Sequence, residues 1–105
     1  MYTLALYPNG MIEYTPGWES EMTTVFRNGN DEIVFRRYLR GDVIVVQEYH
    51  INLDGREDFF TMPETMVEEL RLSVRLCIEY NPRCSRRVRD AALAAFDQFT
   101  PPTPP

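Results

Sequence analysis

Residues 43–80 have the sequence VIVVQEYHINLDGREDFFTMPETMVEELRLSVRLCIEY, in which the spacing of apolar side chains changes partway along. Four consecutive β-branched residues at 43–46 lead into an alternating segment, which predicts a half-buried β-strand over residues 43–51. From Pro63 onward the apolar residues recur at helical spacing, which predicts a helix over residues 63–80. An α+β fold in which strands precede helices is therefore expected.

The residues before this segment predict further antiparallel strands. The clearest signal is the turn sequence PNG at residues 8–10, which lies between two apolar runs and predicts a β-hairpin. Turn sequences at residues 28–30, 40–42 and 52–55 separate the later strands. Together these signals predict an N-terminal antiparallel β-meander of five to six strands, at residues 3–7, 11–15, 22–27, 32–39, 43–51 and 58–61.

A second helix is expected after an Asn-Pro pair ends the first one. Ser85 can cap its N-terminus, and apolar residues recur at helical spacing through residues 88–99. A chain of 105 residues has room for one domain. We place this domain at residues 1–99 and expect a proline-rich disordered tail at residues 100–105.

The charge of the chain limits the partners it can attract. The net charge is −5, so the molecule as a whole repels nucleic acid and membranes, and binding nucleic acid would require a local basic surface. No stretch approaches the roughly 18 apolar residues of a membrane span, and the N-terminus lacks the features of a signal peptide. We expect an intracellular protein, cytoplasmic or nuclear and not secreted, without membrane contact.

Little in the sequence predicts catalysis. The only histidine is His50, and neither a Ser-His-Asp order nor a glycine-rich phosphate loop is present. Cys77 and Cys84 are expected to be reduced thiols, because a metal site would need more ligands. We therefore expect no enzyme activity, no cofactor and no metal site.

The segment RRYLR at residues 36–40 interleaves arginines with an aromatic ring. Strand alternation places Arg36 and Tyr38 on one face and Arg37 on the other. An exposed ring beside an arginine can hold single-stranded nucleic acid, because the ring stacks on a base while the cation binds a phosphate. The alternative is that Tyr38 belongs to the core and the arginines are solvated.

A second group of arginines gathers at the start of the second helix, where positive charge opposes the helix dipole. These arginines either bind an acidic partner or pair with the glutamates Glu68, Glu69 and Glu79. The candidate partner-binding residues are Arg83, Arg86, Arg87 and Arg89.

Residues 32–74 contain an ordered set of motifs. A strand and a turn lead to a long strand ending in Glu-Tyr plus a ring, and an acidic glycine turn, a short strand and a helix beginning with Pro-Glu follow. The motif residues are Tyr38, 43–46, Glu48, Tyr49, His50, Asp54, Gly55, Met62, Pro63, Glu64 and Leu70. This pattern resembles the positive-cofactor-four family of transcriptional coactivators.

The resemblance implies a homodimer that binds single-stranded DNA in grooves formed by curved sheets. Tyr38 falls where that family has a base-stacking phenylalanine, and His50 falls where it has an aromatic residue. The sequence departs from the family at Gln47, which replaces an arginine, and at residues 56–60, which replace a longer basic stretch. The expected nucleic-acid-binding residues are Arg36, Tyr38, Arg40, His50 and Arg56.

Two functions are therefore compatible with the sequence. The first is a dimeric, transcription-coactivator-like domain that binds single-stranded DNA or RNA. The alternative is an acidic protein-interaction module, a viral, phage or host regulator, that mimics nucleic acid and does not bind it. The acidic residues that favour the alternative are Glu13, Glu19, Glu21, Asp31 and Glu32.

Overall fold

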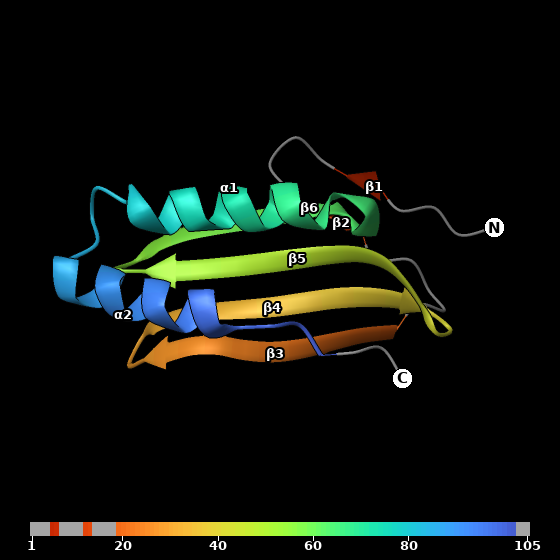
Figure 1. The fold of residues 1–105 in the computed structure, drawn as a ribbon, viewed down its shortest axis with the longest axis horizontal. Helices are drawn as coiled ribbons and strands as arrows, with labels where there is room; N and C mark the ends of the chain where they lie inside the picture. The colour runs from red at the N-terminus through yellow and green to blue at the C-terminus, as the bar shows by residue number, and fades with distance from the viewer. Residues whose placement is uncertain (1–4, 7–11, 14–18, 103–105) are drawn as a thin grey trace.

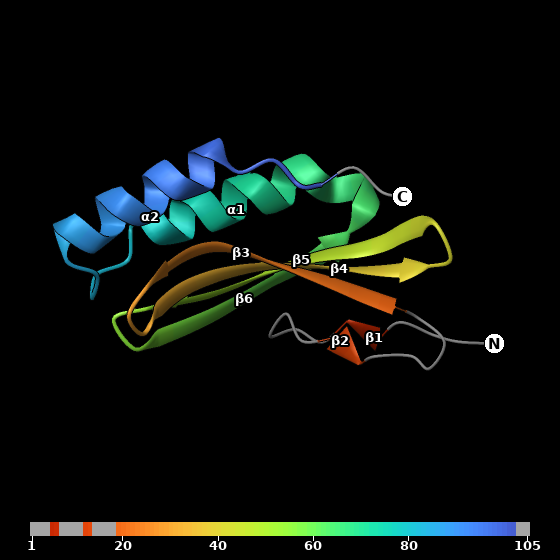
Figure 2. The same ribbon diagram turned by 90° about the horizontal axis from the view of Figure 1, so that it is seen from below.

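The computed structural model describes residues 5–6, 12–13 and 19–102 of the chain. Within them, four long strands form one antiparallel sheet, and two helices lie on one face of it (Figures 1 and 2). The strands follow sequence order across the sheet. The elements are β3 (Glu19–Asn28), β4 (Asp31–Arg40), β5 (Val43–Leu53), β6 (Arg56–Pro63), the 3-10 turn η1 (Glu64–Met66), α1 (Val67–Glu79) and α2 (Arg86–Gln98).

The predicted α+β class and the order of strands before helices are confirmed, but the predicted number of strands in the meander is wrong. The N-terminal strands β1 (Ala5–Leu6) and β2 (Ile12–Glu13) pair with each other in a separate sheet, so the meander has four strands rather than five to six. A turn sequence predicts that its flanking strands pair, but it does not indicate which sheet they join. In Figure 2 this small sheet lies on the side of the main sheet away from the helices.

The turn between β5 and β6 has an unusual backbone conformation. Asp54 and Gly55 both have positive φ, 51° and 81°, as a type I′ hairpin turn requires. The backbone N–H of Asp54 donates to Asp31 Oδ1 (2.8 Å), and Asp54 Oδ2 accepts from the backbone N–H of Ser85 (3.0 Å). These bonds tie the turn to the start of β4 and to the loop before α2.

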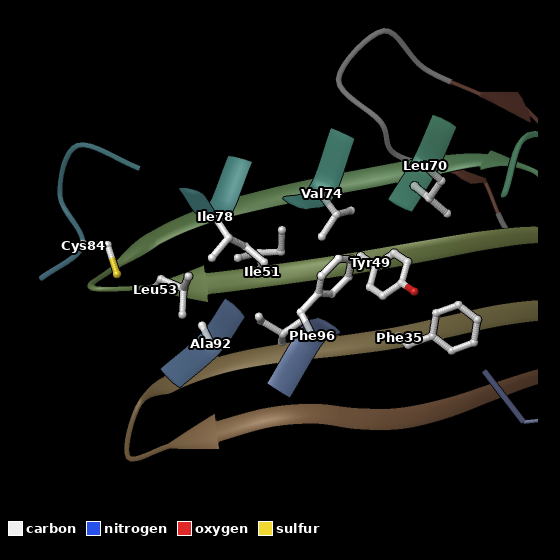
Figure 3. Close-up of a cluster of buried hydrophobic side chains, with 11 residues drawn as sticks. Phe35, Tyr49, Ile51, Leu53, Leu70, Val74, Ile78, Cys84, Ala92 and Phe96 are labelled. Carbon is white, nitrogen blue, oxygen red and sulfur yellow. The ribbon is translucent and has the colours of Figure 1, made fainter. Parts of the chain in front are cut away.

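The hydrophobic core lies between the helices and the sheet (Figure 3). Alternate residues of β4 and β5 face the helices, and α1 contributes residues at four-residue spacing. Each fully buried side chain of this size stabilises the fold by roughly 1.5–3 kcal/mol. The buried core residues are Ile33, Phe35, Tyr49, Ile51, Leu53, Leu70, Val74, Ile78, Cys84, Ala92 and Phe96.

The helix boundaries follow from strand pairing and capping. Pairing between β5 and β6 continues to Pro63, so α1 begins at Val67, after the 3-10 turn, rather than at residue 63. The Ser85 hydroxyl accepts from the backbone N–H of Val88 (3.3 Å) and caps α2 as predicted. Neither described helix is long and apolar enough to cross a membrane.

Candidate nucleic-acid interface

The candidate interface is the face of the main sheet that points away from the helices (Figure 2). No described helix lies on this face, although the small sheet of β1 and β2 lies on the same side of the main sheet (Figure 2). A shallow hollow of about 170 Å³ lies on it, between Met22 on β3 and Phe59 on β6. Antiparallel pairing aligns the side chains in rows across the strands, one containing Met22, Arg36, Glu48 and Thr61 and the next containing Thr24, Val34, His50 and Phe59.

In the first row Arg36 is held by its neighbours. Its Nη1 donates to the Tyr38 hydroxyl (3.5 Å), and its Nη2 lies 3.4 Å from the sulfur of Met22. Glu48 stands directly opposite on β5 and accepts from the Thr61 hydroxyl (3.3 Å). Burial raises the pKa of Glu48, an effect that the positive charge of Arg36 partly offsets.

In the second row two rings are stacked. The rings of His50 and Phe59 are 4.2 Å apart between centroids and only 3° from parallel. His50 Nε2 lies 2.9 Å from Glu57 Oε1, which fixes the orientation of the imidazole. Phe59 is 40% exposed, so this stack presents an aromatic edge of the hollow to solvent.

The charge on this face is mixed. Arg27 forms an ion pair with Glu32, Arg36 lies opposite Glu48, and His50 contacts Glu57. Each of these basic groups therefore has a carboxylate as its neighbour. A phosphate that binds here competes with a carboxylate for the same basic group, so the face is not a continuous positive track.

The structure brings together three of the five residues that the sequence predicts to bind nucleic acid. Arg36, Tyr38 and His50 share the face that points away from the helices, but Tyr38 is buried there (8% exposed) and packs against Val46. Arg40 is exposed at the end of β4, next to the β4–β5 turn. Arg56 faces the helix side, because it lies opposite the core residue Leu53, and it pairs with Asp58 (3.1 Å).

The arginines around the start of α2 have different surroundings. Arg83, Arg86 and Arg87 are exposed, and Arg86 lies 3.8 Å from Asp90. Arg89 is partly buried, and its guanidinium donates to the backbone carbonyls of Asn81 (2.7 Å) and Cys84 (3.2 Å). Arg89 therefore holds the α1–α2 loop.

One of the three glutamates predicted to pair with these arginines, Glu79, has another partner. Glu79 accepts from Arg75 (3.1 Å), which also binds Asp97 on α2 (3.0 Å). This pairing joins the two helices side by side. The exposed guanidinium groups of Arg83, Arg86 and Arg87 remain candidates for binding an acidic partner.

Sequence reasoning missed Phe59, which completes the aromatic stack. Alternation along residues 57–61 would have placed Glu57, Phe59 and Thr61 on the face opposite Phe60, which packs on the core. The alternation of apolar and polar residues is a weak signal here, because Phe59 and Phe60 are adjacent. Two neighbouring phenylalanines do not show which of them faces the core.

Comparison with known proteins adds no assignment, since no family model, curated protein or solved structure matches the chain. The fold and the face define a class of small α+β domain, with a four-stranded meander covered on one face by two helices. Among the described residues, no group of three or more His, Cys, Asp or Glu side chains is placed to hold a metal ion.

Proposed function

We propose that this chain is a single-stranded nucleic-acid-binding domain that uses the sheet face away from the helices. The observation that carries the proposal is the stacked His50–Phe59 pair, which lies one row from Arg36 in the same hollow. A base that stacks on the exposed side of this pair extends an existing stack, and the guanidinium of Arg36 lies within the reach of the attached phosphate. The role in transcription implied by the sequence resemblance is part of this proposal.

The mixed charge of the face affects how such binding depends on salt. Carboxylates beside Arg27, Arg36 and His50 partly neutralise these basic groups. Few phosphates are therefore neutralised when a strand of nucleic acid binds. For single strands the slope of log K against log salt is about −0.7 per phosphate contacted. A small slope, with stacking as the main source of affinity, is therefore expected.

The test is fluorescence anisotropy with labelled single-stranded and double-stranded oligonucleotides over a salt series. Phe59→Ala should weaken single-strand binding by about 1–3 kcal/mol, the usual contribution of one base–aromatic stack. Arg56→Ala is the matched control, because Arg56 lies on the helix side of the same strand. Equal loss in both variants, or no binding by the unmodified chain at low salt, would contradict the proposal.

A second candidate function is an acidic protein-interaction module. The neighbouring carboxylates Glu32, Glu48 and Glu57 favour it, because they give a protein partner alternating charges beside the apolar side chains of Met22 and Val34. Affinity capture on the unmodified chain and on a Met22→Glu variant discriminates the two functions. A partner that the unmodified chain retains and the variant loses, together with no oligonucleotide binding, would establish the interaction module.

A further inference from the structure

The residues after α2 lie in a groove on the helix side of the sheet, which we call the seat and which is formed by Arg37, Gln47, Tyr49 and Arg71. The helix ends at Gln98, and Phe99 has φ −75° and ψ 128°, close to the polyproline II conformation. From there the chain runs along the part of the sheet that α2 does not cover (Figure 1). The ring of Phe99 anchors this segment, since it lies 5.4 Å from the ring of Phe35 and 6.4 Å from that of Tyr49.

Two arginines bind backbone carbonyls of this segment. Arg71 on α1 donates to the carbonyl of Phe99 (3.3 Å), and Arg37 on β4 donates to the carbonyl of Pro102. These two carbonyls are three residues apart. A polyproline II helix has three residues per turn, so carbonyls at this spacing recur along one side of such a chain.

The seat contains polar groups that are almost completely buried. Arg37 is 2% exposed, and Gln47, directly opposite it on β5, is also buried. Arg37 has a carboxylate partner in Glu21 (2.8 Å), and the tail carbonyl provides a further acceptor for the guanidinium. A cavity of about 240 Å³ continues from the seat, between Gln47, Tyr49 and Arg71 and the segment Phe99, Thr100 and Pro101.

These features match the chemistry by which proline-rich chains are bound. Such ligands lie on aromatic grooves, and their unpaired carbonyls accept from donors in the groove. The tail sequence FTPPTPP at residues 99–105 has four prolines. Thr100 and Pro102 are exposed, so the segment is held by one ring and a few carbonyl bonds.

We propose that this seat, defined by Arg37, Gln47, Tyr49 and Arg71, is a binding site for proline-rich extended segments of a partner protein. The chain's own tail is the intramolecular ligand, and a partner segment binds by displacing it. The site lies on the opposite side of the sheet from the proposed nucleic-acid interface, so either function can fail independently.

The test uses the full chain and a labelled peptide with the tail sequence FTPPTPP. In Pro101→Gly/Pro102→Gly the tail keeps its length but loses its preorganisation, so the peptide should bind this variant at least about tenfold more tightly than the unmodified chain. Adding Arg37→Met to the variant should abolish the gain, whereas Arg40→Met, on the same strand, should not. Nuclear magnetic resonance should show shifts at Arg37 Nε–H and at the Gln47 side-chain amide.

Three outcomes would overturn the proposal. The first is no peptide binding by the loosened variant, which would show that the tail only stabilises the fold and that the seat does not bind a separate peptide. The second is equal binding of a peptide in which alanines replace the prolines. The third is a change of molecular mass on loosening the tail, which would show that the tail is exchanged between copies of the chain.

Discussion

Glu48 has a carboxylate that is almost fully buried, on a face that no described helix covers. It is 7% exposed and lies between Arg36 and Thr61. Burial raises its pKa in the folded state above the value in the unfolded chain. Its contribution to stability is therefore complete below the ordinary carboxyl pKa and is lost as the pH rises through the folded-state pKa.

The substitution Glu48→Gln should remove this pH dependence. We expect the variant to have a higher Tm than the unmodified chain at pH 7, with the difference disappearing near pH 4, where an ordinary glutamate is about half protonated. Thermal unfolding followed by circular dichroism between pH 4 and pH 8 measures the effect. Glu57→Gln is the more exposed control, and a Glu48→Gln variant less stable at pH 7 would show that attraction to Arg36 outweighs burial.

At the scale of single residues, the sequence predicts which face of the sheet a side chain points to, but it does not predict whether that side chain is buried. The sequence correctly places Arg36 and Tyr38 on one face and Arg37 on the other, because a strand has a period of two. It does not predict that Arg37 is the buried arginine, since the carbonyl that it binds belongs to Pro102, 65 positions later. Contacts at this separation depend on the packing of the whole chain.

Among the elements, the α1–α2 pair depends on Arg71. Its guanidinium donates to the carbonyls of Phe96 (3.3 Å), Asp97 (3.4 Å) and Phe99 (3.3 Å), and it lies 4.8 Å from the centroid of the Phe96 ring. The last carbonyls of a helix lack partners within the helix. Arg71 therefore acts as the C-terminal cap of α2 and links this helix to α1.

Replacing this cap should destabilise the domain. Arg71→Met keeps most of the apolar stem but leaves the carbonyls without their charged donor, so we expect a loss of about 2 kcal/mol in the free energy of unfolding. Arg75→Met, one turn away, is the control, because its ion pairs with Glu79 and Asp97 are at the surface and should contribute much less. Urea unfolding measures both, and equal losses would contradict the capping role.

The existence and order of the long elements could be predicted for a physical reason. Periodicity and turn residues are local, and they are sufficient to define β3 to β6, α1 and α2 approximately. The strands predicted at the N-terminus also pair with each other, but no local pattern shows that they form a sheet separate from that of β3 to β6. The His50–Phe59 stack depends on the register of β5 and β6, which a single-strand pattern does not specify.

For the whole molecule, the outer side of α1 carries a stripe of exposed apolar side chains. Leu72, Leu76 and Tyr80 recur every four residues and are exposed, Tyr80 at 72%. At about 100° per residue they point roughly opposite to Leu70, Val74 and Ile78, which face the sheet. We propose that this stripe pairs with its copy across a two-fold axis, which would give the homodimer that the sequence resemblance implies.

Such a dimer would join helix layer to helix layer and leave both proposed nucleic-acid interfaces pointing outward. Leu72→Glu/Leu76→Glu should therefore halve the mass measured by light scattering to that of one 12.3 kDa chain. Val43→Glu, at an exposed apolar residue of the sheet, should leave the dimer intact.

The dimer surface lies on α1, whereas the proposed nucleic-acid interface lies on the far face of the sheet. The monomeric variant should therefore keep its affinity for a short oligonucleotide, with one oligonucleotide bound per chain. A strict monomer in the unmodified chain would exclude the helix pairing, and loss of oligonucleotide binding with dimerisation would place the binding site across the two-fold axis.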